Sequence, residues 1–114
     1  MSNYSFDLSY IECISSDPSF IKGMVSTFVE EIPLNLEQLK SYYKKGDLES
    51  MGDIAHKVKP TIIMLNMDQI KPIIVKFEEL CRNNGDKKEI GLLLEEIERG
   101  CMSVVDQLKA KYED

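Results

Sequence analysis

The sequence of 114 residues lacks several features that mark common classes of protein. Its three cysteines, Cys13, Cys81 and Cys101, stand far apart, with no CxxC motif and no zinc-type spacing. Isolated cysteines favour a reducing compartment, and we expect these three to be small apolar residues of a core. No apolar run approaches the roughly 20 residues that span a bilayer, and the first residues lack the features of a secretory signal. We therefore expect a cytoplasmic protein.

Positive charge is also scarce. The chain has 14 lysines and arginines against 20 acidic residues, which gives a formal net charge of -6. Such a chain is repelled by nucleic acid and by anionic membranes unless a local basic patch overrides the balance. The sequence has no large patch of this kind, so it predicts no nucleic-acid partner and no membrane partner. It also has no glycine-rich phosphate loop and no metal triad, so we expect no bound nucleotide, metal or cofactor.

Helical periodicity, by contrast, runs through nearly the whole chain. It predicts helices at residues 8–14, 18–43, 48–65, 68–82 and 87–112. Asp17 is a good N-cap, and Pro18 suits a first helical position. Pro33 lies inside the second helical pattern and should kink that helix or split it near Glu31. Pro72 falls near the start of the fourth pattern.

Four long amphipathic helices joined by short turns predict one arrangement. The fold should be all-α, an antiparallel up-down-up-down four-helix bundle, with the short N-terminal helix capping one end. The length suits one domain, which we expect to span residues 1–114. Because each helix has one clear apolar stripe, we expect a monomer.

The single histidine, His56, lies in the middle of the predicted helix 48–65. The apolar residues of this helix gather on one side and should face the core. They are Met51, Ile54, Val58, Ile62 and Leu65. His56 projects nearly opposite this stripe, so we expect its imidazole to be exposed.

The neighbours of His56 on that face suggest a docking site. Gly52, one turn before, should leave room around the imidazole, and Ile63, two turns after, should expose an apolar side chain. Lys57 and Lys59 add positive charge in an acidic protein. An exposed neutral imidazole is a good nucleophile near pH 7, and its attack on an acyl phosphate would give a phosphohistidine. Lys59, at i+3, could contact the phosphoryl oxygens.

The segment Ala55-His56-Lys57-Val58-Lys59 resembles the core of the histidine-containing phosphotransfer (HPt) domain family. In that family an Ala-His-x-x-Lys-Gly motif lies mid-helix in a four-helix bundle. The likeness covers roughly residues 17–82. The resemblance implies that His56 is the phosphoacceptor and that Lys59 contacts the phosphate. It also implies a response-regulator receiver domain as partner, with a hybrid histidine kinase as a further candidate, and it places the magnesium on the receiver.

Two residues depart from the family pattern. Pro60 stands where the family has glycine. It removes the hydrogen bond to the His56 carbonyl, which typically costs ~3 kcal/mol inside a helix, and it should bend the helix just beyond His56. Asn66 replaces the usual turn glycine, although asparagine tolerates the same left-handed backbone.

These observations leave three functions open. The leading hypothesis is a phosphorelay carrier, not an autonomous enzyme, with Gly52, Lys57, Pro60 and Ile63 in the docking surface around His56. The first alternative is a binding-only module that docks a receiver or kinase domain without taking phosphate, because Pro60 has impaired the site. The second is a scaffold or oligomerising bundle that uses its apolar helix faces.

Overall fold

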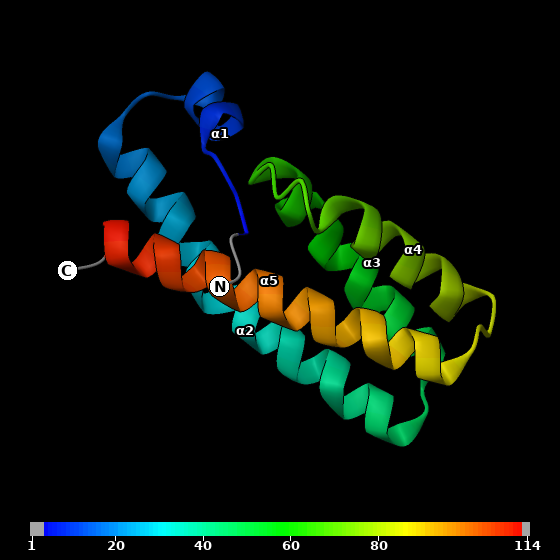
Figure 1. The fold of residues 1–114 in the computed structure, drawn as a ribbon. Coiled ribbons are helices and arrows are strands. Elements are labelled where there is room, and N and C mark those ends of the chain that lie inside the picture. The colour runs from blue at the N-terminus through cyan, green and yellow to red at the C-terminus, as the bar shows by residue number, and fades with distance from the viewer. Residues whose placement is uncertain (1–3, 113–114) are drawn as a thin grey trace.

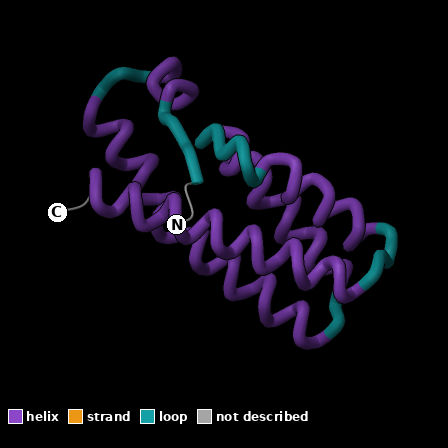
Figure 2. The backbone as a smooth tube through the Cα atoms, in the orientation of Figure 1, coloured by secondary structure: helices purple, strands orange, loops and turns teal. Residues whose placement is uncertain are grey.

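The computed structural model describes residues 4–112, so residues 1–3 and 113–114 of the predicted domain lie outside the described range. The described residues form five helices: α1 (Ser9–Ile14), α2 (Pro18–Lys45), α3 (Leu48–Met64), α4 (Lys71–Arg82) and α5 (Lys87–Tyr112). Successive long helices run in opposite directions, and α1 lies at the end where α2 begins and α5 ends (Figure 1). Figure 2 shows helices joined by loops and no strand within the described residues. The all-α bundle predicted from the sequence is confirmed.

Helix α2 is longer and more continuous than predicted. The Asp17 carboxylate caps it by accepting from the Ser19 N–H, and Pro18 takes the first position. The helix passes through Pro33 without a break, so of the two predicted outcomes, a kink or a split near Glu31, the split is wrong. It ends at Lys45 and is capped by Gly46, whose φ of 72° is the left-handed conformation that glycine adopts without strain.

Helix α4 begins later than predicted, at Lys71 and not at residue 68. Its second position is Pro72, where the missing N–H would have had no helical partner. The residues before it form a turn instead. Asn66 takes a left-handed φ of 51° there, and the Met67 N–H donates to the Ile62 carbonyl. In a helix that starts at residue 68, Pro72 would lie beyond the first turn and break a hydrogen bond. In the helix that forms, it lies in the first turn, where proline is tolerated.

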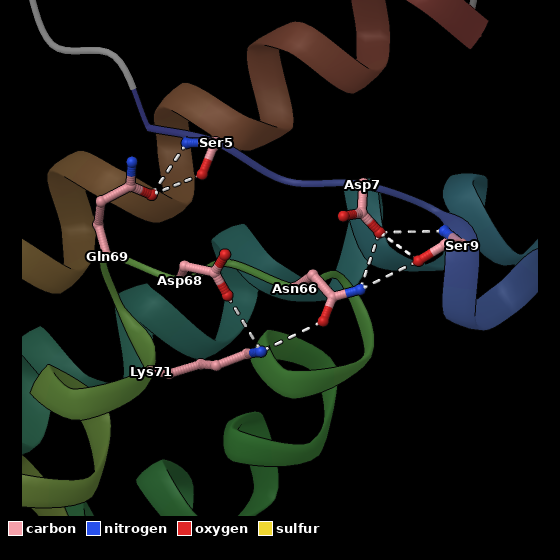
Figure 3. A network of polar contacts seen from close by, with 7 residues as sticks. All are labelled: Ser5, Asp7, Ser9, Asn66, Asp68, Gln69 and Lys71. Atoms are coloured by element: carbon pink, nitrogen blue, oxygen red, sulfur yellow. Dashed lines mark hydrogen bonds and ion pairs between the residues drawn. The ribbon is translucent and has the colours of Figure 1, made fainter.

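The segment that precedes α1 is hydrogen-bonded to this α3–α4 turn (Figure 3). The Asp7 N–H donates to the Leu65 carbonyl at 2.9 Å. The Asp7 carboxylate accepts from the Asn66 amide at 2.8 Å, while the Ser5 N–H and hydroxyl both donate to the Gln69 side chain at 3.0 Å. Asn66 therefore does more than tolerate a left-handed turn, because its side chain also binds the segment that precedes α1. We refer to the Asp7–Asn66 pair as the N-terminal latch.

The core lies where the four long helices meet, with α3 packed on α2 and α4, and α5 packed on α2 and α4. Two of the three cysteines, Cys81 and Cys101, are buried in it, as the sequence predicted. Cys13 is exposed, so its predicted place in the core is wrong. No helix within residues 4–112 combines the length and the apolar character that a membrane span requires.

The fold also gathers lysines that are distant in the sequence. Lys44 at the end of α2 and Lys88 at the start of α5 line one hollow together with Tyr43. The Lys87 ammonium lies over the Tyr43 ring, 5.5 Å from its centroid. Glu95 and Glu98 line the same hollow, so its charge is mixed. These lysines therefore do not amount to the large basic patch that the sequence was predicted to lack.

Candidate functional site

His56 lies in the middle of α3 with its side chain 69% exposed, as the sequence predicted. The residues on the opposite side of the helix hold it against the core, with Val58 3% exposed and Ala55 fully buried. Ile54, predicted to belong to the core stripe, is only half-buried, and Ala55 takes the central place. Ala55 is therefore enclosed by the core, while the imidazole of the next residue extends into solvent.

The imidazole is paired with a carboxylate on the neighbouring helix. His56 Nδ1 lies 3.1 Å from Glu78 Oε2, and Lys59 Nζ lies 2.9 Å from the other oxygen, Glu78 Oε1. The Glu78 side chain is only 14% exposed, and that of Lys59 is 29% exposed. One carboxylate of α4 therefore contacts both residues that the sequence singled out on α3.

The charge of Glu78 decides which nitrogen of His56 carries the proton. Burial raises the pKa of Glu78, but the hydrogen bonds and charges of Lys59 and His56 outweigh it, so the pKa lies below its ordinary value. Glu78 is therefore ionised at neutral pH, and a carboxylate can only accept hydrogen bonds. Nδ1 of His56 must carry the proton that Glu78 accepts. The lone pair of the neutral ring is then on Nε2, which no hydrogen bond engages among the described residues.

A second cation lies beside this pair. Arg82 Nη1 donates to Asp53 Oδ1 at 2.7 Å, and Arg82 Nη2 lies 3.8 Å from Glu78 Oε2. The arginine reaches Asp53 by crossing over Gly52, where its Cδ, Nε and Cζ lie 3.2 Å from the position of an added Cβ. The prediction that Gly52 leaves open room around the imidazole is therefore wrong. Gly52 is buried, and the space that it leaves is filled by Arg82.

The other predicted docking residues lie around the histidine on α3. Lys57 is exposed, and its side chain makes no ion pair or hydrogen bond within residues 4–112. Pro60 is exposed and lies inside α3, which continues to Met64. Ile63 is 47% exposed, and Val75 of α4 is 43% exposed. Val75 also borders an open hollow of about 340 Å³ together with Lys59 and Arg82.

Sequence reasoning missed Glu78 and Arg82 as members of the site. They are four residues apart on α4, so they share one face of that helix. This spacing was visible in the sequence, but it did not indicate that the face would lie against His56. Only the antiparallel packing of α3 on α4 brings the two patterns together. Within residues 4–112, no three His, Cys, Asp or Glu side chains gather in a way that would hold a metal ion.

Comparison with known protein families identifies the family of the chain. The family model described as Hpt domain matches residues 23–113, which is most of the chain and includes α3, α4 and nearly all of α2. No curated protein and no solved structure matches the chain. The segment before residue 23, with α1 and Asp7 of the latch, lies outside the matched region. The chain belongs to the Hpt domain family, whose members are phosphocarrier modules of histidine phosphotransfer in phosphorelay signalling.

Proposed function

We propose that this chain relays a phosphoryl group on Nε2 of His56, to or from the aspartate of a response-regulator receiver domain. The observation that carries the proposal is the exposed imidazole with its Nδ1 bonded to Glu78. That bond leaves the nucleophilic lone pair on the solvent side of the ring. Exposure matters because the acceptor must reach a phosphoryl group that is bound to another protein.

The uptake step requires no group beyond those of the two partners. The Nε2 lone pair of His56 attacks the phosphorus of an acyl phosphate on the receiver. An N–P bond forms, the P–O bond to the acyl group breaks, and the aspartate leaves as a carboxylate with the bonding electron pair. Lys59 can turn its ammonium group toward the phosphoryl oxygens, where a charge-assisted hydrogen bond stabilises the added negative charge. The magnesium of this reaction is expected on the receiver.

The surface around His56 suits a partner that brings an apolar contact beside a phosphoryl site. Ile63 and Val75 expose apolar side chains on α3 and α4, and Pro60 lies between His56 and Ile63 in the chain. Lys57 and Lys59 supply positive charge next to them. The lack of an ATP-type phosphate loop and the single histidine favour a carrier that depends on its partners.

The direct test is transfer of label from a phosphorylated receiver domain to the purified chain. We expect an acid-labile phosphoryl label on the wild type and none on His56→Ala. Circular dichroism of the His56→Ala variant would show that its helices are intact. Equal labelling of the two proteins, or no label on either, would contradict the proposal. If a receiver binds both proteins equally well and transfers nothing, the binding-only alternative is favoured.

A further inference from the structure

We propose that the hollow between α2 and α5 binds a small organic anion with an apolar ring, of the aromatic carboxylate class. The hollow has a volume of about 370 Å³, a size that suits a small molecule. Its lining comes from the last turns of α2 and the first half of α5. None of the lining residues belongs to the site around His56, so the proposal does not depend on the proposed phosphotransfer.

Tyr43 and Leu92 form the apolar part of the hollow. The Tyr43 hydroxyl donates to the Lys87 carbonyl at 3.2 Å, which holds the aromatic side chain against α5. Gly91 makes this approach possible, because a Cβ at that position would overlap the Tyr43 hydroxyl. Leu92 is 59% exposed, so the hollow leaves apolar surface in contact with water. A ring packed on Leu92 and Tyr43 would remove this surface from water, which is favourable in proportion to the area covered.

Lys44 and Lys88 supply positive charge at one end of the hollow. Both residues are exposed, and neither ammonium group makes an ion pair or hydrogen bond within residues 4–112. The Lys87 ammonium group lies close by, over the Tyr43 ring. A carboxylate placed between Lys44 and Lys88 would accept charge-assisted hydrogen bonds from both. The net charge of the whole chain is -6, so this end of the hollow attracts an anion against the general repulsion.

The acidic side chains of the hollow lie toward its other end. Lys88 and Glu95 are seven residues apart on α5, which is about two turns or roughly 10 Å along the helix axis. Glu98 is paired with Lys40 at 2.7 Å, so its charge is compensated. Glu95 makes no ion pair or hydrogen bond of its side chain within the described residues. The hollow is therefore positive at the Lys44 end and negative near Glu95. This polarity fits a ligand whose carboxylate lies at one end of an apolar body.

The test is a titration of the nitrogen-15-labelled full-length chain with 3-phenylpropionate, followed through its backbone amide signals by NMR. Two matched compounds separate the contributions of charge and ring. The first, 3-phenylpropionamide, keeps the ring and replaces the carboxylate by a neutral amide, while propionate keeps the carboxylate and lacks the ring. The variant Lys44→Gln/Lys88→Gln removes the two charges of the hollow. Its control, Lys22→Gln/Lys109→Gln, removes one exposed lysine from each of the same two helices.

We expect 3-phenylpropionate to bind saturably in the millimolar range, with shifts of the amides of residues 40–44 and 88–98. The dissociation constant should be about tenfold higher for the amide compound, and about tenfold higher for the acid on Lys44→Gln/Lys88→Gln, because each change removes charge-assisted hydrogen bonds. The Lys22→Gln/Lys109→Gln control should bind like the wild type. Propionate should not saturate the site, and added salt should weaken binding of the acid but not of the amide.

Four results would overturn the proposal. Equal affinity for the acid and the amide would mean that the hollow does not select an anion. Equal affinity of the wild type and Lys44→Gln/Lys88→Gln would exclude these lysines from the site. Shifts centred on Lys59 and Arg82 would mean that the anion prefers the cations beside His56. Absence of saturable binding to the folded wild type would exclude the ligand class. None of these results bears on the phosphoacceptor, which the labelling experiment tests separately.

Discussion

The Arg82 side chain lies across Gly52, with three of its atoms 3.2 Å from the place where an alanine Cβ would stand. This contact connects α4 to α3 one turn before His56, and it ends in the ion pair between Arg82 and Asp53. A glycine in mid-helix is unfavourable by itself, by about 1 kcal/mol relative to alanine. Here the missing side chain has a structural consequence, because it lets the Arg82 side chain approach the α3 backbone closely and reach Asp53.

Gly52→Ala tests this relationship. The new Cβ must push the Arg82 side chain away by a few tenths of an ångström, and that side chain can yield because it is 39% exposed. We expect the gain in helix propensity to be partly offset by the weakened Arg82 contacts, so that the free energy of unfolding changes by less than about 1 kcal/mol.

The matched control is Gly23→Ala on α2, where the glycine is exposed and nothing lies within 4 Å of the added Cβ. The free energy of unfolding of this variant should rise by the whole difference in helix propensity between glycine and alanine, about 1 kcal/mol. Urea unfolding measures the free energy of unfolding of both variants. A loss of more than 1 kcal/mol in Gly52→Ala would mean that Arg82 is held more rigidly than its exposure indicates.

Lys59→Ala tests the proposed phosphate contact. Removing the ammonium group takes away a charge-assisted hydrogen bond to the phosphoryl oxygens, and it also leaves Glu78 without its closest cation. We expect loading of His56 by phosphoramidate to be about tenfold slower than in the wild type. Lys22→Ala, which removes an exposed lysine of α2, should load like the wild type. Equal loading rates for Lys59→Ala and Lys22→Ala would remove Lys59 from the proposed site.

The features of α3 that were predicted correctly depend on residues close together in the sequence. The 3.6-residue period placed His56 opposite the buried stripe because a helix converts spacing directly into direction. The same period placed Ile54 in the core, where it is only half-buried, while Ala55 is fully buried. The pattern of one helix does not determine which part of its apolar face the neighbouring helices cover.

The features that were missed all depend on packing between helices. Glu78 and Arg82 carry no signal in their own helix that points to His56, which is more than 20 residues earlier in the chain. Gly52 was interpreted as open space because the residue that fills the space comes from α4. The start of α4 could have been placed better, because Pro72 already favours a first turn that begins at Lys71.

The three cysteines should differ sharply in reactivity. Burial raises the pKa of Cys81 to about 11 and that of Cys101 to about 12, so neither forms the reactive thiolate near neutral pH. Cys13 is exposed on α1. We expect a disulfide reagent such as DTNB to modify one thiol rapidly in the native protein and all three after unfolding. The rapid phase should disappear in Cys13→Ser, and its persistence there would show that a core cysteine becomes accessible in the native state.

The N-terminal latch should make stability depend on pH in the acid range. Hydrogen bonds from the Ser9 hydroxyl, the Asn66 amide and the Ser9 N–H lower the pKa of Asp7. A carboxyl group whose pKa is lowered by folding stabilises the protein fully above its unfolded pKa, which is about 3.9 for aspartate. This contribution is lost as the pH falls through the lowered folded pKa. Asp7→Asn should therefore be less stable than the wild type at pH 7 and should lose less stability on acidification.

Asn66→Gly separates the latch from the turn that carries it. Glycine adopts the φ of 51° at residue 66 without strain, so the turn should survive while the amide that binds Asp7 is lost. If the latch acts as a pair, the double variant should be less destabilised than the sum of the two single variants, because the second substitution removes an interaction that is already gone. Urea midpoints at pH 7 for the four proteins give this coupling directly. Strict additivity would mean that Asp7 and Asn66 stabilise the protein independently. The role of Asn66 would then be limited to the left-handed backbone of the turn.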